Sequence, residues 1–163
     1  MQRIAQFMKV SPERFPADWQ FDCPNPYEKL KLPRRGTSGS AGYDFFSPLD
    51  FTLAPGEFIK IPTGIRARID EGWVLTLYPR SGQGFKYRLQ LYNSVGVIDS
   101  DYFGAENEGH IQIKIVNANE EGKVLTVRRG EAFAQGIFLP FGVTVDDDAA
   151  DVRTGGFGST DRS

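Results

Sequence analysis

Residues 93–104 read N-S-V-G-V-I-D-S-D-Y-F-G, and the interpretation of the whole chain starts from this stretch. An apolar pair, Val97 and Ile98, runs directly into Asp99 and Asp101. Because unpaired buried carboxylates are costly, this strand end must face water, a cation or a ligand. Asp, Ser and Gly are also ordinary turn formers, so a hairpin turn with solvated carboxylates is the simpler alternative. Chemistry elsewhere in the chain favours the first interpretation.

Outward from this stretch, most of the chain alternates apolar and polar residues with a period of two. We expect strands over 1–10, 58–61, 65–69, 73–78, 111–115, 124–127 and 134–141, and at most one short helix, over 81–87. Short strands separated by Gly and Pro turns predict an all-β sandwich or barrel. We expect a single domain over 1–145, with an inserted loop at 11–29 ordered by its aromatic side chains, and a flexible glycine-rich arm over 146–163.

The composition argues against several classes of function. The chain has 163 residues, of which 40% are hydrophobic and 25% charged, as in ordinary globular domains. Its net charge of −2 gives no basic excess for nucleic acid, and no apolar run approaches the roughly 20 residues that span a bilayer. The single cysteine, Cys23, excludes an internal disulfide and is consistent with a reducing compartment. We therefore expect a cytoplasmic protein that binds neither nucleic acid nor membranes.

A second segment with candidate chemistry, 79–84 (P-R-S-G-Q-G), directly follows an expected strand. Its small residues leave backbone N–H groups accessible, Ser81 adds a hydroxyl and Arg80 adds a fixed positive fork, a combination that suits a polyphosphate. A plain turn with a surface arginine is the alternative. The tail, 153–160, holds an arginine, three hydroxyl side chains and Phe157 among glycines, which fits either a frayed terminus or an arm that closes over a nucleotide.

The candidates for a general base are few. His110 is the only histidine, which argues against His-dependent triads and multi-His metal sites, and we expect it at the surface or at a strand end. A carboxylate is then the expected base. Asp99 is the preferred candidate because it follows Val97 and Ile98 at a rigid strand end.

Five short blocks, in this order, resemble the trimeric dUTP pyrophosphatases (dUTPases): 41–44 (A-G-Y-D), 79–82 (P-R-S-G), 93–104, 130–138 and 155–160 (G-G-F-G-S-T). The resemblance covers about residues 30–160. It implies a jelly-roll-like β fold, a homotrimer with sites built from three chains, and hydrolysis of dUTP to dUMP and pyrophosphate, which removes dUTP and supplies dUMP for thymidylate synthesis. It also implies Mg²⁺ held mainly by the triphosphate and waters.

The resemblance assigns roles to individual residues. Asp99 would orient and deprotonate the water that attacks the α-phosphorus, the hairpin from Asn93 would receive uracil, and Tyr102 would lie against the deoxyribose. Residues with implied roles in substrate binding are Arg80, Ser81, Gly82, Asn93, Gly96, Val97, Tyr102, Gln135, Arg153, Phe157, Gly158 and Ser159, supported by Asp44 and Lys86.

The chain also departs from the family pattern. Ala132 and Phe133 replace Arg and Ile, Phe103 stands where Arg is common, and residues 105–108 lengthen the following loop; Arg153 also lies one residue closer to the glycines, and Asp161 replaces a Gly. We still expect an active enzyme. A dCTP deaminase of the same fold would need a catalytic Glu on the strand at 111–115, which has no acid. A non-enzymatic nucleotide sensor, with a partner protein bound at the 11–27 loop or the 105–108 insert, is the other alternative.

Overall fold

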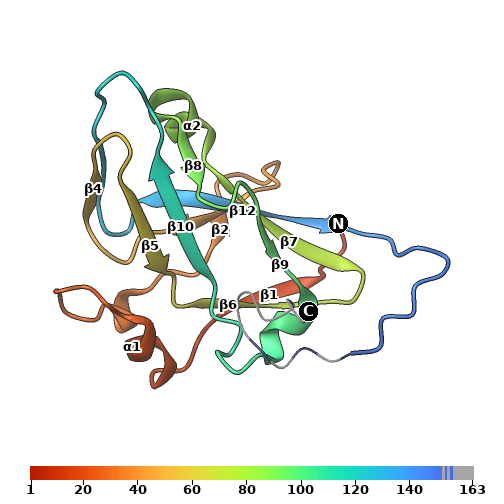
Figure 1. Ribbon diagram of the computed structural model, residues 1–163. Helices are drawn as coiled ribbons and strands as arrows, with labels where there is room; N and C mark the ends of the chain where they lie inside the picture. Colours follow the sequence, from red (N-terminus) through yellow and green to blue (C-terminus); the bar gives the residue numbers. More distant parts are fainter. Residues whose placement is uncertain (152, 154, 156–163) are drawn as a thin grey trace.

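Antiparallel strands make up most of the regular structure in the computed structural model, which describes residues 1–151, 153 and 155 (Figure 1). Every strand expected from the sequence is present, including the one that ends before Asp99, and further short strands lie between them. The strands are β1 (Ala5–Lys9), β2 (Arg34–Arg35), β3 (Tyr43–Phe46), β4 (Phe51–Leu53), β5 (Phe58–Pro62), β6 (Ile65–Ile69), β7 (Trp73–Pro79), β8 (Leu89–Leu91), β9 (Gly96–Ile98), β10 (Gln112–Asn117), β11 (Leu125–Val127) and β12 (Ala132–Pro140).

Two sheets carry the core. One has the strand order β2-β3-β12-β7-β9 and the other β5-β10-β8, and all the pairings are antiparallel; β1-β6 and β11-β4 form two smaller pairs. In β10, buried residues alternate with partly exposed ones, which is the period-two pattern of a strand with one face in the core. Both sheets contribute side chains that are almost completely buried: Phe45, Ile61, Leu75, Leu77, Leu89, Ile98, Ile113, Ile115 and Phe133.

The 93–104 stretch connects the two sheets. β8 pairs with β10, whereas β9 pairs with β7, so the chain changes sheets between them. A bridge between Leu91 and Ser94 closes the turn, and Ser94 has a φ of 67°. The expected hairpin is therefore a sheet-switching turn. Because β9 is the edge strand of its sheet, one side of this stretch has no strand neighbour in the described part of the chain.

The helices correct part of the sequence-based expectation. The helix expected over 81–87 is confirmed as α2 (Ser81–Tyr87), but a second helix, α1 (Arg14–Asp18), lies within the 11–29 segment. Two 3₁₀ turns follow, η1 (Tyr27–Lys29) and η2 (Ser100–Gly104). None of the helices in the described residues is long and apolar enough to cross a membrane.

Aromatic packing holds the 11–29 segment against the domain. Phe15 is fully buried, and its ring lies within 5.4–6.0 Å of the rings of Trp19, Tyr27 and His110. His110 is also fully buried, so it does not lie at the surface; it lies two residues before the start of β10, which agrees with the expected strand end. The physical reason is that α1 covers this end of β10, where His110 finds partners for both ring nitrogens.

Candidate functional site

A cleft of about 620 Å³ opens where β7 ends and α2 begins. Six of the residues assigned to substrate binding or support line it, together with glycines and polar side chains from neighbouring loops. The lining residues are Gly36, Ser40, Gly42, Asp44, Arg80, Ser81, Gly82, Gln83, Lys86, Tyr87 and Gln135. The strand–turn–helix at 79–87 therefore lies next to the A-G-Y-D block and β12.

The cleft carries groups that suit a polyanion. Arg80 and Lys86 supply positive charge, Ser81 supplies a hydroxyl, and the first N–H groups of a helix have no intrahelical partner. Arg80 Nε lies 3.0 Å from Asp44 Oδ1, and 43% of the Arg80 side chain is exposed. The carboxylate thus orients a guanidinium whose remaining donors are accessible to a ligand.

Gln135 and Gly42 show why the A-G-Y-D block belongs to this cleft. Gln135 Nε2 donates a hydrogen bond to the carbonyl of Pro79 at 3.0 Å, which ties β12 to the end of β7. A Cβ at residue 42 would collide with Gln135 Oε1, the end of a flexible side chain, so a larger residue here would displace the amide from its present position. The sequence therefore places a side-chain amide, rather than a bulkier neighbour, on the wall of the cleft.

A second group of candidate residues surrounds Asp99, which precedes η2. The Asp99 side chain is 48% exposed, and its Oδ2 lies 3.1 Å from Arg153 Nη2. Arg153 Nε lies 3.4 Å from Asp101 Oδ1, and Arg153 Cζ lies 5.6 Å from the centroid of the Tyr102 ring. Asp99, Asp101 and Tyr102 are therefore brought together around the Arg153 side chain.

Tyr102 is the least exposed member of this group, at 2%. Its hydroxyl donates to the His110 carbonyl at 2.9 Å and accepts from Asn107 Nδ2 at 2.7 Å. Burial raises the pKa of Tyr102, so the hydroxyl stays protonated. In this structure the Arg153 guanidinium lies beside the Tyr102 ring, the group that is expected to contact a sugar.

The turn before Asp99 combines exposed and buried residues. Asn93 and Val97 are exposed, whereas Gly96 is buried. A Cβ on Gly96 would lie 3.0 Å from Leu77 Cβ and Cδ1, so the glycine lets β9 approach β7 closely. In the structure Gly96 packs against Leu77, and the neighbouring Val97 is exposed.

The two groups of residues lie apart within one chain. No residue from 93 to 102 lines the cleft. Ile98 pairs with Leu75, and Arg80 lies five residues further along the extended β7, which at the usual rise corresponds to roughly 17 Å. The cleft and the Asp99 group are therefore separate parts of a site.

Three features complete the account of the predicted residues. Phe157, Gly158 and Ser159 lie outside the described residues. Among the residues that are described, no group of three or more His, Cys, Asp or Glu side chains could hold a metal ion. Asn107, which the sequence reasoning missed, contacts the Tyr102 hydroxyl; its place in the 105–108 insert was the available signal.

Comparison with known sequences gives a consistent picture. The dUTPase family model matches residues 28–161. A deoxyuridine 5′-triphosphate nucleotidohydrolase from Lactococcus lactis is 44% identical over 134 residues, which is 80% of this chain and 88% of that protein. The protein of the same name from Tolumonas auensis is 41% identical over 142 residues, which is 82% of this chain and 89% of its own.

Solved structures resemble the fold as well. The crystal structure of a dUTPase from Streptococcus mutans aligns with a TM-score of 0.65 and 34% identity, covering 86% of this chain and 98% of that one. A dUTPase from phage phi11 of S. aureus, described with a coordinated structural Mg(II) ion, aligns with a TM-score of 0.63 and 21% identity, covering 91% and 98% of the two chains. At that identity the phage protein supports the fold alone.

Proposed function

The chain belongs to the dUTPase family, and on this premise we propose that it hydrolyses dUTP to dUMP and pyrophosphate. The observation that carries the proposal is the Asp99 group: an accessible carboxylate beside a fixed tyrosine ring and an arginine. A protein that only bound nucleotide would have no need of a carboxylate at this position. A single, exposed cysteine supports a cytoplasmic enzyme.

Asp99 is the proposed general base. Its carboxylate follows β9, whose pairing with β7 fixes the backbone, while half of the side chain stays open to water. Asp99 orients a water molecule and accepts a proton from it as the water oxygen attacks the α-phosphorus. The bond between the α-phosphorus and the oxygen that bridges to the β-phosphate breaks, which releases pyrophosphate. Catalysis then depends on positioning and on neutralisation of charge.

The cleft residues bind the phosphates in this proposal. Arg80 and Lys86 balance negative charge, while Ser81 and the backbone at Gly82 donate hydrogen bonds. Arg153 pairs with Asp99 and Asp101 in this structure, and it would pair with the phosphates instead when the substrate binds. Phe157 and Ser159, in the segment that follows, are proposed to contact the base and the terminal phosphate.

Magnesium fits the donors of this chain as an ion carried by the substrate. The described residues offer isolated carboxylates and no all-protein cage, and Mg²⁺ commonly combines one or two carboxylates with phosphate oxygens and water. Asp44, beside the cleft, is the residue that would face its water shell. When bound, the ion would neutralise charge on the triphosphate.

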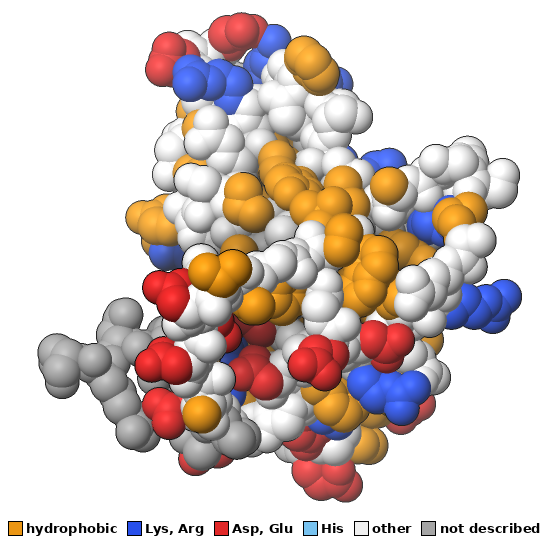
Figure 2. All heavy atoms as spheres, turned by 90° about the vertical axis from the view of Figure 1, so that its right-hand side faces the viewer, with side chains coloured by type: hydrophobic (Ala, Val, Ile, Leu, Met, Phe, Trp, Pro, Cys, Tyr) orange, Lys and Arg blue, Asp and Glu red, His pale blue; other side chains and the backbone are white. Residues whose placement is uncertain are grey.

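The separation of the two groups supports a homotrimer. Because Asp99 and the cleft lie apart within one chain, a complete site needs Asp99 from one copy and Arg80 from another. Figure 2 shows hydrophobic side chains gathered across one face of the molecule. Exposed Val97 on edge strand β9 and exposed Leu139 on β12 are the kind of apolar residues that such an assembly would cover.

The direct test is release of pyrophosphate from dUTP with Mg²⁺, with dCTP, UTP and dTTP as competing substrates. We expect turnover of dUTP alone and its loss on chelation of Mg²⁺. Ammonia release from dCTP would instead identify a deaminase. Tight binding of dUTP without pyrophosphate release would identify a sensor and contradict the proposal.

A further inference from the structure

We propose that Asn107 is a positioning residue that fixes the Tyr102 ring and so sharpens the discrimination between a 2′-deoxyribose and a ribose. The inference rests on the proposed function, in which Tyr102 lies against the sugar. Asn107 belongs to the 105–110 loop, which contains the insert at 105–108. The loop thus acts on a substrate-facing ring through a hydrogen bond.

The hydroxyl of Tyr102 has partners on both sides. It donates to the His110 carbonyl at 2.9 Å and accepts from Asn107 Nδ2 at 2.7 Å, and Asn107 Oδ1 accepts from the Gly109 N–H at 3.2 Å. The Asn107 side-chain amide therefore donates to the Tyr102 hydroxyl through its nitrogen and accepts from the loop backbone through its oxygen. Since a hydroxyl held from two directions resists rotation and translation of its ring, the ring occupies a defined place.

The loop is wound tightly against η2. Glu108 and Gly109 both have positive φ, 60° and 68°. A Cβ on Gly109 would lie 2.6 Å from the Tyr102 carbonyl oxygen and 2.9 Å from Phe103 Cα, so no other residue fits without displacing η2. The Asn107 amide is consequently presented to Tyr102 by a backbone with little freedom.

Glu108 fastens the loop to the N-terminal segment. Its carboxylate accepts from the Ser11 N–H at 2.8 Å and from the Ser11 hydroxyl at 2.6 Å. Arg66, whose guanidinium stacks on Phe103 at 3.6 Å, donates to the Phe103 carbonyl at 2.6 Å and lies 3.9 Å from the same carboxylate. These contacts join β6, η2 and the 11–29 segment around the loop.

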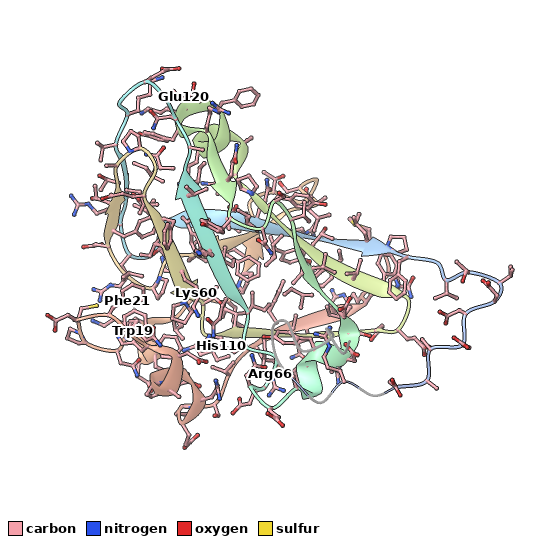
Figure 3. All side chains as sticks on the ribbon, viewed as in Figure 1. Trp19, Phe21, Lys60, Arg66, His110 and Glu120 are labelled. Atoms are coloured by element: carbon pink, nitrogen blue, oxygen red, sulfur yellow. The ribbon has the colours of Figure 1, made fainter. Side chains whose placement is uncertain are left out.

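His110, two residues after Glu108, provides a second anchor for the loop. Its Nε2 accepts from the Gly64 N–H at 2.8 Å, and Nδ1 lies 2.6 Å from Asp18 Oδ2, which Arg14 also contacts. Figure 3 shows His110 at the lower end of β10, with α1 on one side and Arg66 and η2 on the other. The loop that contacts Tyr102 is thus tied to residues 11–18 at Glu108 and at His110.

The functional consequence follows from sterics. The Tyr102 ring can exclude the additional 2′-hydroxyl of a ribose only if the ring itself is prevented from moving away. Loss of the Asn107 bond would remove one restraint on the Tyr102 hydroxyl and let the ring yield to a ribose. A single hydrogen bond is commonly worth about tenfold in an equilibrium or a rate ratio, which sets the scale of the expected loss of discrimination.

The experiment measures kcat/KM for dUTP and UTP in the full-length protein and in Asn107→Ala, Tyr102→Phe and the double variant. We expect Asn107→Ala to lower the dUTP-to-UTP ratio about tenfold, chiefly by improving UTP. Tyr102→Phe keeps the ring, so it provides the test even if Asn107→Ala folds poorly. If Asn107 acts through the hydroxyl, the double variant will resemble Tyr102→Phe alone.

Glu106→Ala is the matched control, since Glu106 is exposed and has no hydrogen bond or ion pair among the described residues. The dUTP-to-UTP ratio of Glu106→Ala should equal that of the wild type.

Additive effects of Asn107→Ala and Tyr102→Phe, or an unchanged dUTP-to-UTP ratio in Tyr102→Phe, would overturn the inference while leaving dUTP hydrolysis intact. If the wild type fails to hydrolyse dUTP, the proposed function fails, and the ratio of dUDP to UDP binding constants replaces the kinetic ratio. Absence of any preference in that binding would overturn the role of Asn107 as well.

Discussion

The cleft at β7 and the Asp99–Tyr102 region differ in how firmly the fold holds their functional groups. In the cleft, Arg80 is partly exposed with one carboxylate partner, and Ser81 and Gly82 are exposed. In the other region, Tyr102 is buried, and its hydroxyl is hydrogen-bonded to Asn107 and His110 of a tightly wound loop. A triphosphate is flexible, and exposed charged side chains can adjust to it. A general base and a ring that contacts the sugar must instead be held in fixed positions.

The largest expected effect tests whether the Asp99 region carries the chemistry. Asp99→Asn removes the proton acceptor and keeps the shape, so kcat for dUTP should fall by about 100-fold or more. Binding of a non-hydrolysable dUTP analogue should remain. The measurement is steady-state pyrophosphate release alongside calorimetric binding.

Asp101→Asn is the control for that variant. Asp101 has the same charge and a similar exposure, and it also contacts Arg153. Its kcat should stay within a few-fold of the wild type, because no proton transfer is assigned to it. An equal loss in both variants would show that the charge beside Arg153, and not a base at residue 99, determines the rate.

The next prediction addresses the separation of the two regions. Arg80→Ala should also be nearly inactive, because a charge that stabilises the reacting phosphates is lost. If each site takes Asp99 and Arg80 from different copies, a mixed and reassembled 1:1 preparation of Asp99→Asn and Arg80→Ala chains should regain roughly a quarter of the wild-type rate. Sites built within one chain would give no recovery on mixing.

The comparison also shows which features were predictable from the sequence. The strands were predictable, because alternation of apolar and polar residues, as in Ile65–Ile69, reflects a pleated strand with one buried face. The grouping of Arg80 with Ser81 and Gly82 was also accessible, since these residues are neighbours in the chain. The dUTPase resemblance rested on the same kind of short, contiguous blocks, and the family match over residues 28–161 confirms it.

Features that depend on distant contacts were not predictable. α1 is short and has no clear periodicity, and its packing comes from Phe15 meeting His110, 95 positions away in the chain. The burial of His110 and the contact between Asn107 and Tyr102 depend on the same packing. The distance between Asp99 and Arg80 follows from the register of β9 on β7, which no local pattern specifies.

A stability measurement sharpens the contrast between the two regions. Glu108→Ala leaves the Ser11 N–H and hydroxyl and the Arg66 guanidinium without the carboxylate, so the free energy of unfolding should fall by about 2 kcal/mol. Ser81→Ala, at an exposed position in the cleft, should change it by less than about 0.5 kcal/mol. Urea denaturation of both variants gives the comparison. Equal values would show that the 105–110 loop is held no more firmly than the cleft.

The smallest expected effect is the pH dependence of stability that His110 gives to the region holding Tyr102. Burial lowers the pKa of His110 below its ordinary value of 6.5, and the opposing contact with Asp18 does not offset it. Arg14 and Glu108 also face this pair, and burial of Asp18 is outweighed by His110 and Arg14, so the pKa of Asp18 lies below 3.8 and its charge persists. Below pH 6.5 the unfolded chain binds a proton at His110 that the folded chain does not bind. The free energy of unfolding therefore declines as the pH falls toward the folded pKa, and the contribution of His110 is fully present above about pH 7.

The slope of the free energy of unfolding against pH should reach at most about 1.4 kcal/mol per pH unit, and it should disappear in His110→Gln, because the chain has no other histidine. Urea unfolding at intervals between pH 5 and pH 7.5 measures it, and a wild-type curve that rises toward acid would mean that His110 is protonated in the folded state and that Gly64 does not donate to it.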